Sequence, residues 1–174
     1  APLTIPQQPA PAAALRLRLL GEFQVVLGER RIIAAEWKLR KAAALVKLLA
    51  LTPGHRRHRE EVLDLLWPEF DPDTARHNLK QTLYVARRIL EPDLAGRPSR
   101  YLPLQGEFLL LHPDGPVETD LAAFAEAATA ARRDGLPAPY VAALAHYGGD
   151  LLPEDRYEEW TQGPREESRG IYLA

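Results

Sequence analysis

The sequence contains no cysteine, which excludes disulfide bonds, thiolate zinc sites and cysteine nucleophiles and is typical of a cytoplasmic protein. Its apolar runs are short, and none approaches the roughly 20 residues that cross a bilayer, so we expect no membrane contact. A Gly-rich phosphate loop, a Gly-x-Ser-x-Gly turn and a zinc signature are also missing. These absences argue against an enzyme, and we predict neither a cofactor nor a metal site.

What is present indicates a folded protein. Of the 174 residues, 46% are apolar and 26% are charged, a balance that favours a compact core in one ordinary domain or two small ones. The opening APLTIPQQPAPAAA has no charged region before its apolar residues. We therefore interpret residues 1–14 as a disordered lead-in and not as a signal peptide.

The net charge of −2 hides an uneven distribution along the chain. Residues 15–104 hold 17 Lys/Arg and 11 Asp/Glu, a net charge of +6, whereas residues 105–174 hold 5 and 13, a net charge of −8. Such asymmetry indicates two modules with different partners, although chance and solubility are a competing explanation.

The first module is expected to begin with strands and to continue with helices. Alternation of apolar and basic residues predicts short antiparallel strands at 15–20, 23–27 and 30–33. Helical spacing follows in WKLRKAAALVKLLALTPG and in HREEVLDLLWP, of which the second lacks a good N-cap. A third helix should run from the cap Asp71 to Leu90, because Pro72 suits its first position and Pro92 follows its end. Residues 101–104 and 107–111 then read as a hairpin turning at Gln105-Gly106.

From Pro116 the sequence is alanine-rich and helical. VETDLAAFAEAATAARR and APYVAALAHYGGD each carry one apolar stripe, and a third helix is expected to start near Pro164. The two stripes consist of Leu121, Phe124, Ala125 and Ala128, and of Tyr140, Ala143, Leu144 and Tyr147. Helix pairs followed by another helix are the units of helical repeat arrays. We expect residues 117–174 to form a helical domain that is truncated here, since no capping signal precedes the last residue.

The third helix has two unlike faces. At about 100° per residue, His77, Gln81, Tyr84 and Arg88 share one face, and Ala75, Leu79, Leu83, Ala86 and Leu90 share the opposite one. Arg76, Lys80 and Arg87 flank the polar face on one edge and Asn78 on the other, and no acidic residue occurs between 74 and 90. A merely solvated helix usually interleaves acids with bases. We therefore expect Arg76, Lys80, Arg87 and Arg88 to repel one another unless an anion lies across them.

These residue types suit the major groove of DNA. Arg and Lys neutralise phosphates or reach guanine, while Asn and Gln pair bidentately with adenine edges. The second and third helices form a helix-turn-helix-like pair, and the hairpin after them is placed as a wing would be.

The layout resembles a known family. LRLRLLGEFQVVLGERRI, WKLRKAAALVKLLALTPG, REEVLDLLWPEFDPDTARHNLKQTLYVARRIL and YLPLQGEFLLLHP make residues 15–112 resemble an OmpR/PhoB-type winged helix. The segment from VETDLAAFAEAA through ALAHYGGDLLPEDRYEEW is similar to the helical domain of bacterial transcriptional activators (BTAD-containing, antibiotic-regulatory-protein-like regulators). The resemblance implies an α+β fold: a winged helix-turn-helix with N-terminal antiparallel strands and a C-terminal wing, followed by an all-α, TPR-like domain at 117–174.

The resemblance also implies a function. A bacterial, sequence-specific transcription regulator would place residues 72–90 in the major groove of double-stranded DNA and its wing on the flanking backbone. Carried over from the resemblance, the residues expected to face the groove are His77, Asn78, Gln81, Tyr84 and Arg88, with Lys80 and Arg87 nearer phosphates. The further candidate DNA-binding residues, from their type and position alone, are Arg57, His58, Arg59, Arg76 and Arg100. Candidate partners of the helical segment are RNA polymerase, another part of a longer chain, and a second copy of the protein. Two departures are HRRHRE at the start of the second helix and a wing without the usual glycine-rich basic turn.

Several alternatives remain open at this point. The winged helix could serve as a protein-interaction module that does not read DNA, and the helical segment could only cover it. Arg56 to Arg59 either clamp phosphate or form a solvated loop. His55 and His58 are more typical of surface residues than of metal ligands. Trp37, Trp67 and Trp160 are expected to be packing residues and not stacking platforms.

Overall fold

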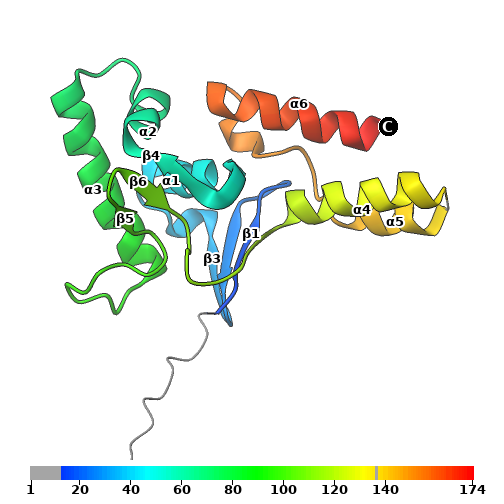
Figure 1. The fold of residues 1–174 in the computed structure, drawn as a ribbon, viewed down its shortest axis with the longest axis horizontal. Helices are drawn as coiled ribbons and strands as arrows, with labels where there is room; N and C mark the ends of the chain where they lie inside the picture. The colour runs from blue at the N-terminus through cyan, green and yellow to red at the C-terminus, as the bar shows by residue number, and fades with distance from the viewer. Residues whose placement is uncertain (1–12, 136) are drawn as a thin grey trace, which may run out of the picture.

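A computed structural model of the protein describes residues 13–135 and 137–174, so most of the expected lead-in lies outside the described residues. Among the described helices, none combines the length and the apolarity needed to span a bilayer. The molecule has two ends, with α3 at one and the pair α4 and α5 at the other, as Figure 1 shows.

The first sheet contains the three predicted strands and one that was not predicted. Its order is β3-β2-β1-β7, and the strands are β1 (Leu15–Arg18), β2 (Gln24–Leu27), β3 (Arg30–Ile33) and β7 (Val117–Thr119). Leu15 and Leu17 of β1 are buried while Arg16 and Arg18 are exposed, as their alternation predicts. The expected strand 15–20 ends at Arg18, because the next two backbone N–H groups turn to the Asp120 carboxylate.

Three helices and a small sheet follow. The helices are α1 (Arg40–Leu51), α2 (Arg59–Leu66) and α3 (Pro72–Leu90), preceded by short 3-10 turns η1 (Ala34–Glu36) and η2 (Pro53–His55). The small sheet has the order β4-β6-β5, with β4 (Arg56–His58), β5 (Leu104–Gln105) and β6 (Phe108–Leu110). The hairpin turns at Gly106 as predicted, with a φ of 61° that suits glycine. The segment Arg56–His58, interpreted as a loop at the mouth of the second helix, is instead a strand paired with β6.

The remaining helices are α4 (Asp120–Asp134), α5 (Pro137–Ala145) and α6 (Glu159–Leu173), with a 3-10 turn η3 (Pro153–Asp155) before the last. The stripe predicted for α4 is confirmed at its centre, because Phe124 and Ala128 are buried. The stripe predicted for α5 is wrong in part: Ala143 is buried, but Tyr140 and Leu144 are exposed. Helix α6 begins at Glu159, five residues before the expected start at Pro164.

One hydrophobic core runs through both ends of the molecule. It joins leucines of β1 and α1 to Phe124 of α4 and to Trp160 of α6. Trp37, Trp67 and Trp160 are all buried, which confirms their expected role in packing. The proposed division between residues 112 and 117 stays a prediction, and Val117–Thr119, assigned by it to the helical segment, pair with β1.

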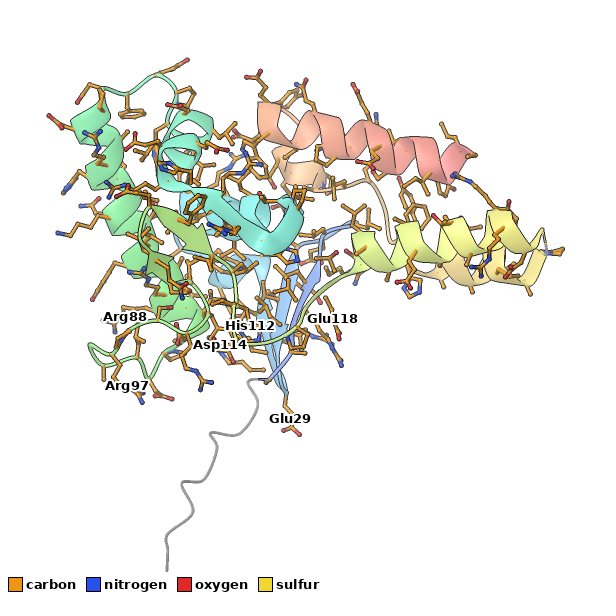
Figure 2. The ribbon with its side chains drawn as sticks, viewed as in Figure 1. Glu29, Arg88, Arg97, His112, Asp114 and Glu118 are labelled. Atoms are coloured by element: carbon orange, nitrogen blue, oxygen red, sulfur yellow. The ribbon has the colours of Figure 1, made fainter. Side chains whose placement is uncertain are left out.

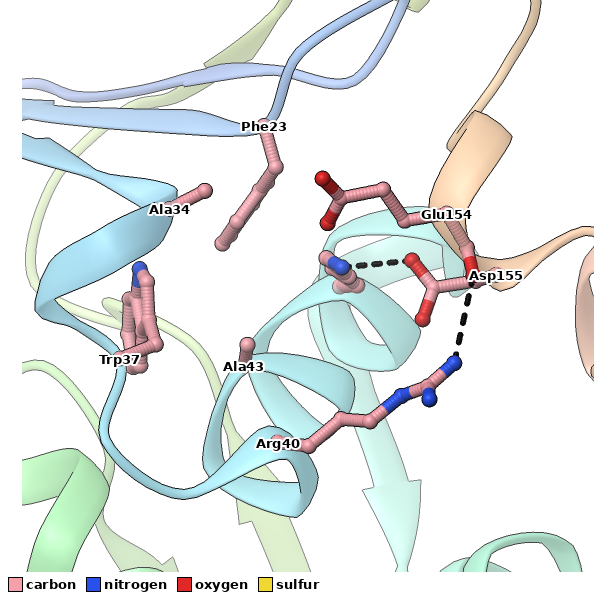
Figure 3. A pocket seen from close by; sticks show the side chains of 8 residues that line it. Phe23, Ala34, Trp37, Arg40, Ala43, Glu154 and Asp155 are labelled. Atoms are coloured by element: carbon pink, nitrogen blue, oxygen red, sulfur yellow. Dashed lines mark hydrogen bonds and ion pairs between the residues drawn. The ribbon is translucent and has the colours of Figure 1, made fainter.

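Buried polar contacts also cross this junction. The Asp120 carboxylate accepts hydrogen bonds from the backbone N–H groups of Leu19 (2.7 Å) and Leu20 (3.0 Å). Burial raises the pKa of the Asp120 carboxyl, and these two hydrogen bonds oppose the shift. A second link is the ion pair at 2.5 Å between the Lys47 ammonium of α1 and the Asp155 carboxylate of η3. Figure 3 labels Asp155 beside α1. The C-terminal helices are therefore held to α1 and β1 by specific contacts.

Candidate nucleic-acid interface

Helix α3 is defined at its start by a side-chain cap. Asp71 accepts a hydrogen bond from the Thr74 backbone N–H at 3.0 Å, and Pro72 occupies the first helical position. The predicted inner stripe is confirmed, since Ala75, Leu79, Leu83, Ala86 and Leu90 are buried. The helix packs this stripe against α1 and α2, so the orientation of its outer face is fixed by the core.

The outer face of α3 is open to solvent. His77, Gln81, Tyr84 and Arg88 are exposed, and Asn78 at the edge is partly exposed. Tyr84 shows 61% of its surface even though it is aromatic. Arg88 donates a hydrogen bond to the Tyr84 hydroxyl at 2.8 Å, with its guanidinium 5.5 Å from the ring centroid. In Figure 1 the C-terminal helices lie at the other end of the molecule and leave this face uncovered.

The residues at the start of α2 are engaged within the protein. Arg57 donates to the Thr52 hydroxyl at 3.1 Å and lies 3.7 Å from the Glu61 carboxylate. Arg59 forms an ion pair with Glu107 of the hairpin turn at 2.7 Å. Their charges are thus partly compensated by acids that lie elsewhere in the fold.

His58 supplies the cap that was not found in the sequence. Its Nδ1 accepts a hydrogen bond from the Glu60 backbone N–H at 3.2 Å at the start of α2, and its ring packs edge-on against Phe108. The Nδ1 of His55 lies 3.2 Å from the Leu49 carbonyl oxygen. Each of these two imidazoles therefore already has a partner in the protein.

Acidic residues also partly neutralise the cation in the first turns of α3. Arg76 lies 3.4 Å from the Asp73 carboxylate and 3.6 Å from that of Glu60 in α2. The expectation that Arg76 repels the other cations for lack of an acid is therefore wrong, because its acids lie just before residue 74 and on another helix.

The remaining predicted cations have no ion pair among the described residues. Arg87 donates from Nε to the Leu102 carbonyl at 2.9 Å, which ties α3 to the hairpin segment, and burial lowers the pKa of its guanidinium. Lys80 and Arg100 carry exposed side chains. The backbone N–H of Arg100 donates to the Glu91 carboxylate at 3.0 Å.

The loop of residues 92–99, for which the sequence predicted no function, lies next to the C-terminal half of α3. Residues 92–99 and the C-terminal half of α3 enclose a groove of about 810 Å³ lined by Lys80, Tyr84, Arg87, Arg88 and Arg97 among others. Arg97 was missed because it lies in a Pro- and Gly-containing loop that shows no periodicity. The proximity of its cation to α3 is a property of the fold.

The sequence matches no protein-family model and no curated protein. Its fold, however, is similar to that of Mycobacterium tuberculosis EmbR, solved in complex with a low-affinity phosphopeptide, with a TM-score of 0.67 and 20% identity. The alignment covers 91% of this chain and 42% of EmbR, so the chain spans less than half the length of that protein. This likeness shows a shared fold, and the order of sheet, three helices, hairpin and further helices fits a winged helix followed by a helical part.

Proposed function

We propose that this protein is a transcription regulator that binds double-stranded DNA through the outer face of α3. The observation that carries the proposal is the open polar face of a helix whose other side is anchored in the core. His77, Asn78 and Gln81 stand on the N-terminal half of this face, the half with which helix-turn-helix proteins read base edges. Tyr84 and Arg88 continue the same face toward the C-terminus.

Cations supply the electrostatic part of the proposed binding. Lys80 and Arg88 are exposed and have no carboxylate partner among the described residues, so a phosphate would meet uncompensated charge. Arg57, Arg59 and Arg76 already face carboxylates, so we assign them weaker contacts. The hairpin β5–β6 would approach the flanking backbone as a wing, with Arg100 before it.

In the same proposal, the helical segment α4 to α6 serves as the surface for a protein partner. RNA polymerase, another part of a longer chain and a second copy of this protein are the candidates. The acidic balance of this segment favours a partner other than DNA, because it would repel phosphates.

The competing function is a protein-interaction module with a winged helix that does not read DNA. The observation that favours it is the tip of the hairpin, Gly106 and Glu107, which carries an acid paired with Arg59 and no cation for a phosphate. Salt dependence separates the two functions. DNA binding loses affinity steeply as salt rises, by about 0.9 in log affinity per log salt for each phosphate neutralised, whereas an apolar protein interface responds weakly.

The test uses a double charge reversal on α3. We expect Lys80→Glu with Arg88→Glu to abolish binding to duplexes that the wild-type protein selects from a random pool, measured by mobility shift at moderate salt. Arg132→Glu with Arg133→Glu on α4 is the matched control, since both arginines are exposed and lie away from α3. Circular dichroism should show both variants folded. Unchanged binding by the α3 variant, or no duplex selected by the wild type, would reject the proposal.

A further inference from the structure

The largest hollow beside α3 is a groove with mixed walls. One side is the C-terminal half of α3 with Lys80, Tyr84, Arg87 and Arg88, and the other is the loop of residues 92–99 with Arg97. Apolar atoms of Leu94, Ala95, Pro98, Pro103 and Leu104 complete the lining. Figure 2 shows Arg88 and Arg97 on the same side of the molecule, near the end of α3.

The loop that forms the outer wall is held in one shape. The Glu91 carboxylate accepts hydrogen bonds from the Ser99 hydroxyl and from the Arg100 backbone N–H, which closes the loop at its base. Arg97 donates to the carbonyls of Asp93 (2.5 Å) and Leu94 (3.3 Å), which braces it across the middle. Pro92 and Pro98 further restrict its backbone. Hydrogen bonds within the protein therefore define the shape of the groove.

The cations of the groove form no ion pair among the described residues, and the acid whose charge acts on Arg87 is Glu91 at the base of the loop. Within residues 13–135 and 137–174, no ion pair involves Lys80, Arg87, Arg88 or Arg97. Arg87 and Arg97 bond only carbonyls and Arg88 bonds a hydroxyl, and these neutral acceptors leave the positive charge in place. The cations at the other end of α3 face carboxylates of Glu60, Asp73 and Glu107. The cations of α3 without an ion pair among the described residues thus lie toward its C-terminal half, next to Arg97 of the loop.

We propose that this groove holds one sugar-phosphate strand of the bound duplex and that Arg97 is a phosphate-binding residue. The inference rests on the proposed function and adds a contact that the α3 face alone does not provide. Helix α3 has 19 residues and is about 28 Å long, more than twice the roughly 12 Å width of the major groove. With its N-terminal half on base edges, its C-terminal half would leave the groove across a backbone strand. The cations suit phosphates, and the apolar walls suit deoxyribose.

The experiment measures the salt dependence of binding to a selected duplex. We expect Arg97→Gln to make the slope of log affinity against log salt shallower by about 0.9, the loss of one phosphate contact. Arg97→Lys keeps the charge and should keep the slope. Arg132→Gln is the matched control, because Arg132 is likewise exposed and bonded to a carbonyl, that of Ile171, at the far end of the molecule.

A second readout locates the contact. Ethylation of single phosphates should interfere with wild-type binding at one position outside the bases that α3 covers, and Arg97→Gln should lose that interference. An unchanged slope in Arg97→Gln, or affinity lost equally in Arg97→Gln and Arg97→Lys with no change of slope, overturns the inference, since the loop would then only support the fold. If the wild type selects no duplex, the proposed function is rejected, and the proposed role of the groove is rejected with it.

Discussion

The ion pair between Lys47 and Asp155 offers a direct test of how the two ends of the molecule are joined. Lys47 Nζ lies 2.5 Å from Asp155 Oδ2, and only 6% and 3% of the two side chains are exposed. Replacing Asp155 by Ala leaves a buried ammonium without its counter-charge. Removing one partner of a buried pair costs about 3–5 kcal/mol, because the remaining charge stays desolvated.

This cost should be visible in thermal and urea unfolding followed by circular dichroism. For a chain of this length, each kcal/mol lowers Tm by about 2–4 °C, so Asp155→Ala should lower it by roughly 6–20 °C. The double variant Lys47→Met with Asp155→Leu replaces both charges by apolar groups and should stay within about 1 kcal/mol of the wild type, since a buried pair adds little net stability over apolar packing. The double variant should therefore be more stable than Asp155→Ala alone.

The reasoning fails if Asp155→Ala costs less than about 1 kcal/mol, or if the effects of Lys47→Met and of Asp155→Leu, each made alone, add in the double variant. That result would mean that water reaches both groups and that the junction opens in solution. Two separate unfolding transitions in the wild type would contradict the continuous core, in which Phe124 and Trp160 pack with β1 and α1.

Three further outcomes follow from the structure. Leu83→Ala should cost about 2–5 kcal/mol in urea unfolding because Leu83 is buried, whereas the exposed neighbour Tyr84→Ala should change stability by less than about 0.5 kcal/mol and weaken duplex binding instead. Burial lowers the pKa of His112, so the unfolded chain takes up a proton before the folded protein does as the pH falls. The free energy of unfolding should therefore decrease as the pH is lowered from about 6.5, and His112→Asn should make this pH dependence weaker. A chain that ends at His112 lacks strand β7, which pairs with β1, and the Asp120 carboxylate, which accepts the hydrogen bond of Leu19 just after β1. It should therefore unfold at a lower urea concentration than the full chain.

Much of the winged helix could be predicted because its signals are local. The stripe from Ala75 to Leu90 follows helical periodicity, and burial of one face is what that periodicity reports. The cap Asp71 and the turn at Gly106 are likewise set by one or two residues. Each of these features was confirmed because no distant part of the chain is needed to specify it.

The short strands β4 and β7 could not be predicted for the opposite reason. Arg56–His58 pair with β6, about fifty positions further along, and Val117–Thr119 pair with β1, about a hundred positions back. A three-residue segment carries too few alternations to indicate a strand. The exposed residues of α5 have a similar cause: Tyr140 and Leu144 follow an apolar pattern, but the described neighbours cover Ala143.

The charge balance of α3 depends on the same kind of distant contact. Counted along the chain, Arg76 and Arg88 are equivalent cations on a helix without acids. Among the described residues, Arg76 meets Glu60 of α2, while Arg88 has Tyr84 as its hydrogen-bond partner and lines the groove together with Arg97. Counting charged residues along a stretch of sequence therefore predicts the net charge of the candidate interface, but not which of its cations lack an acidic partner. Which cations lack an ion pair follows from the tertiary structure, and under the proposed function this predicts that phosphate contacts include the C-terminal end of α3 and its loop.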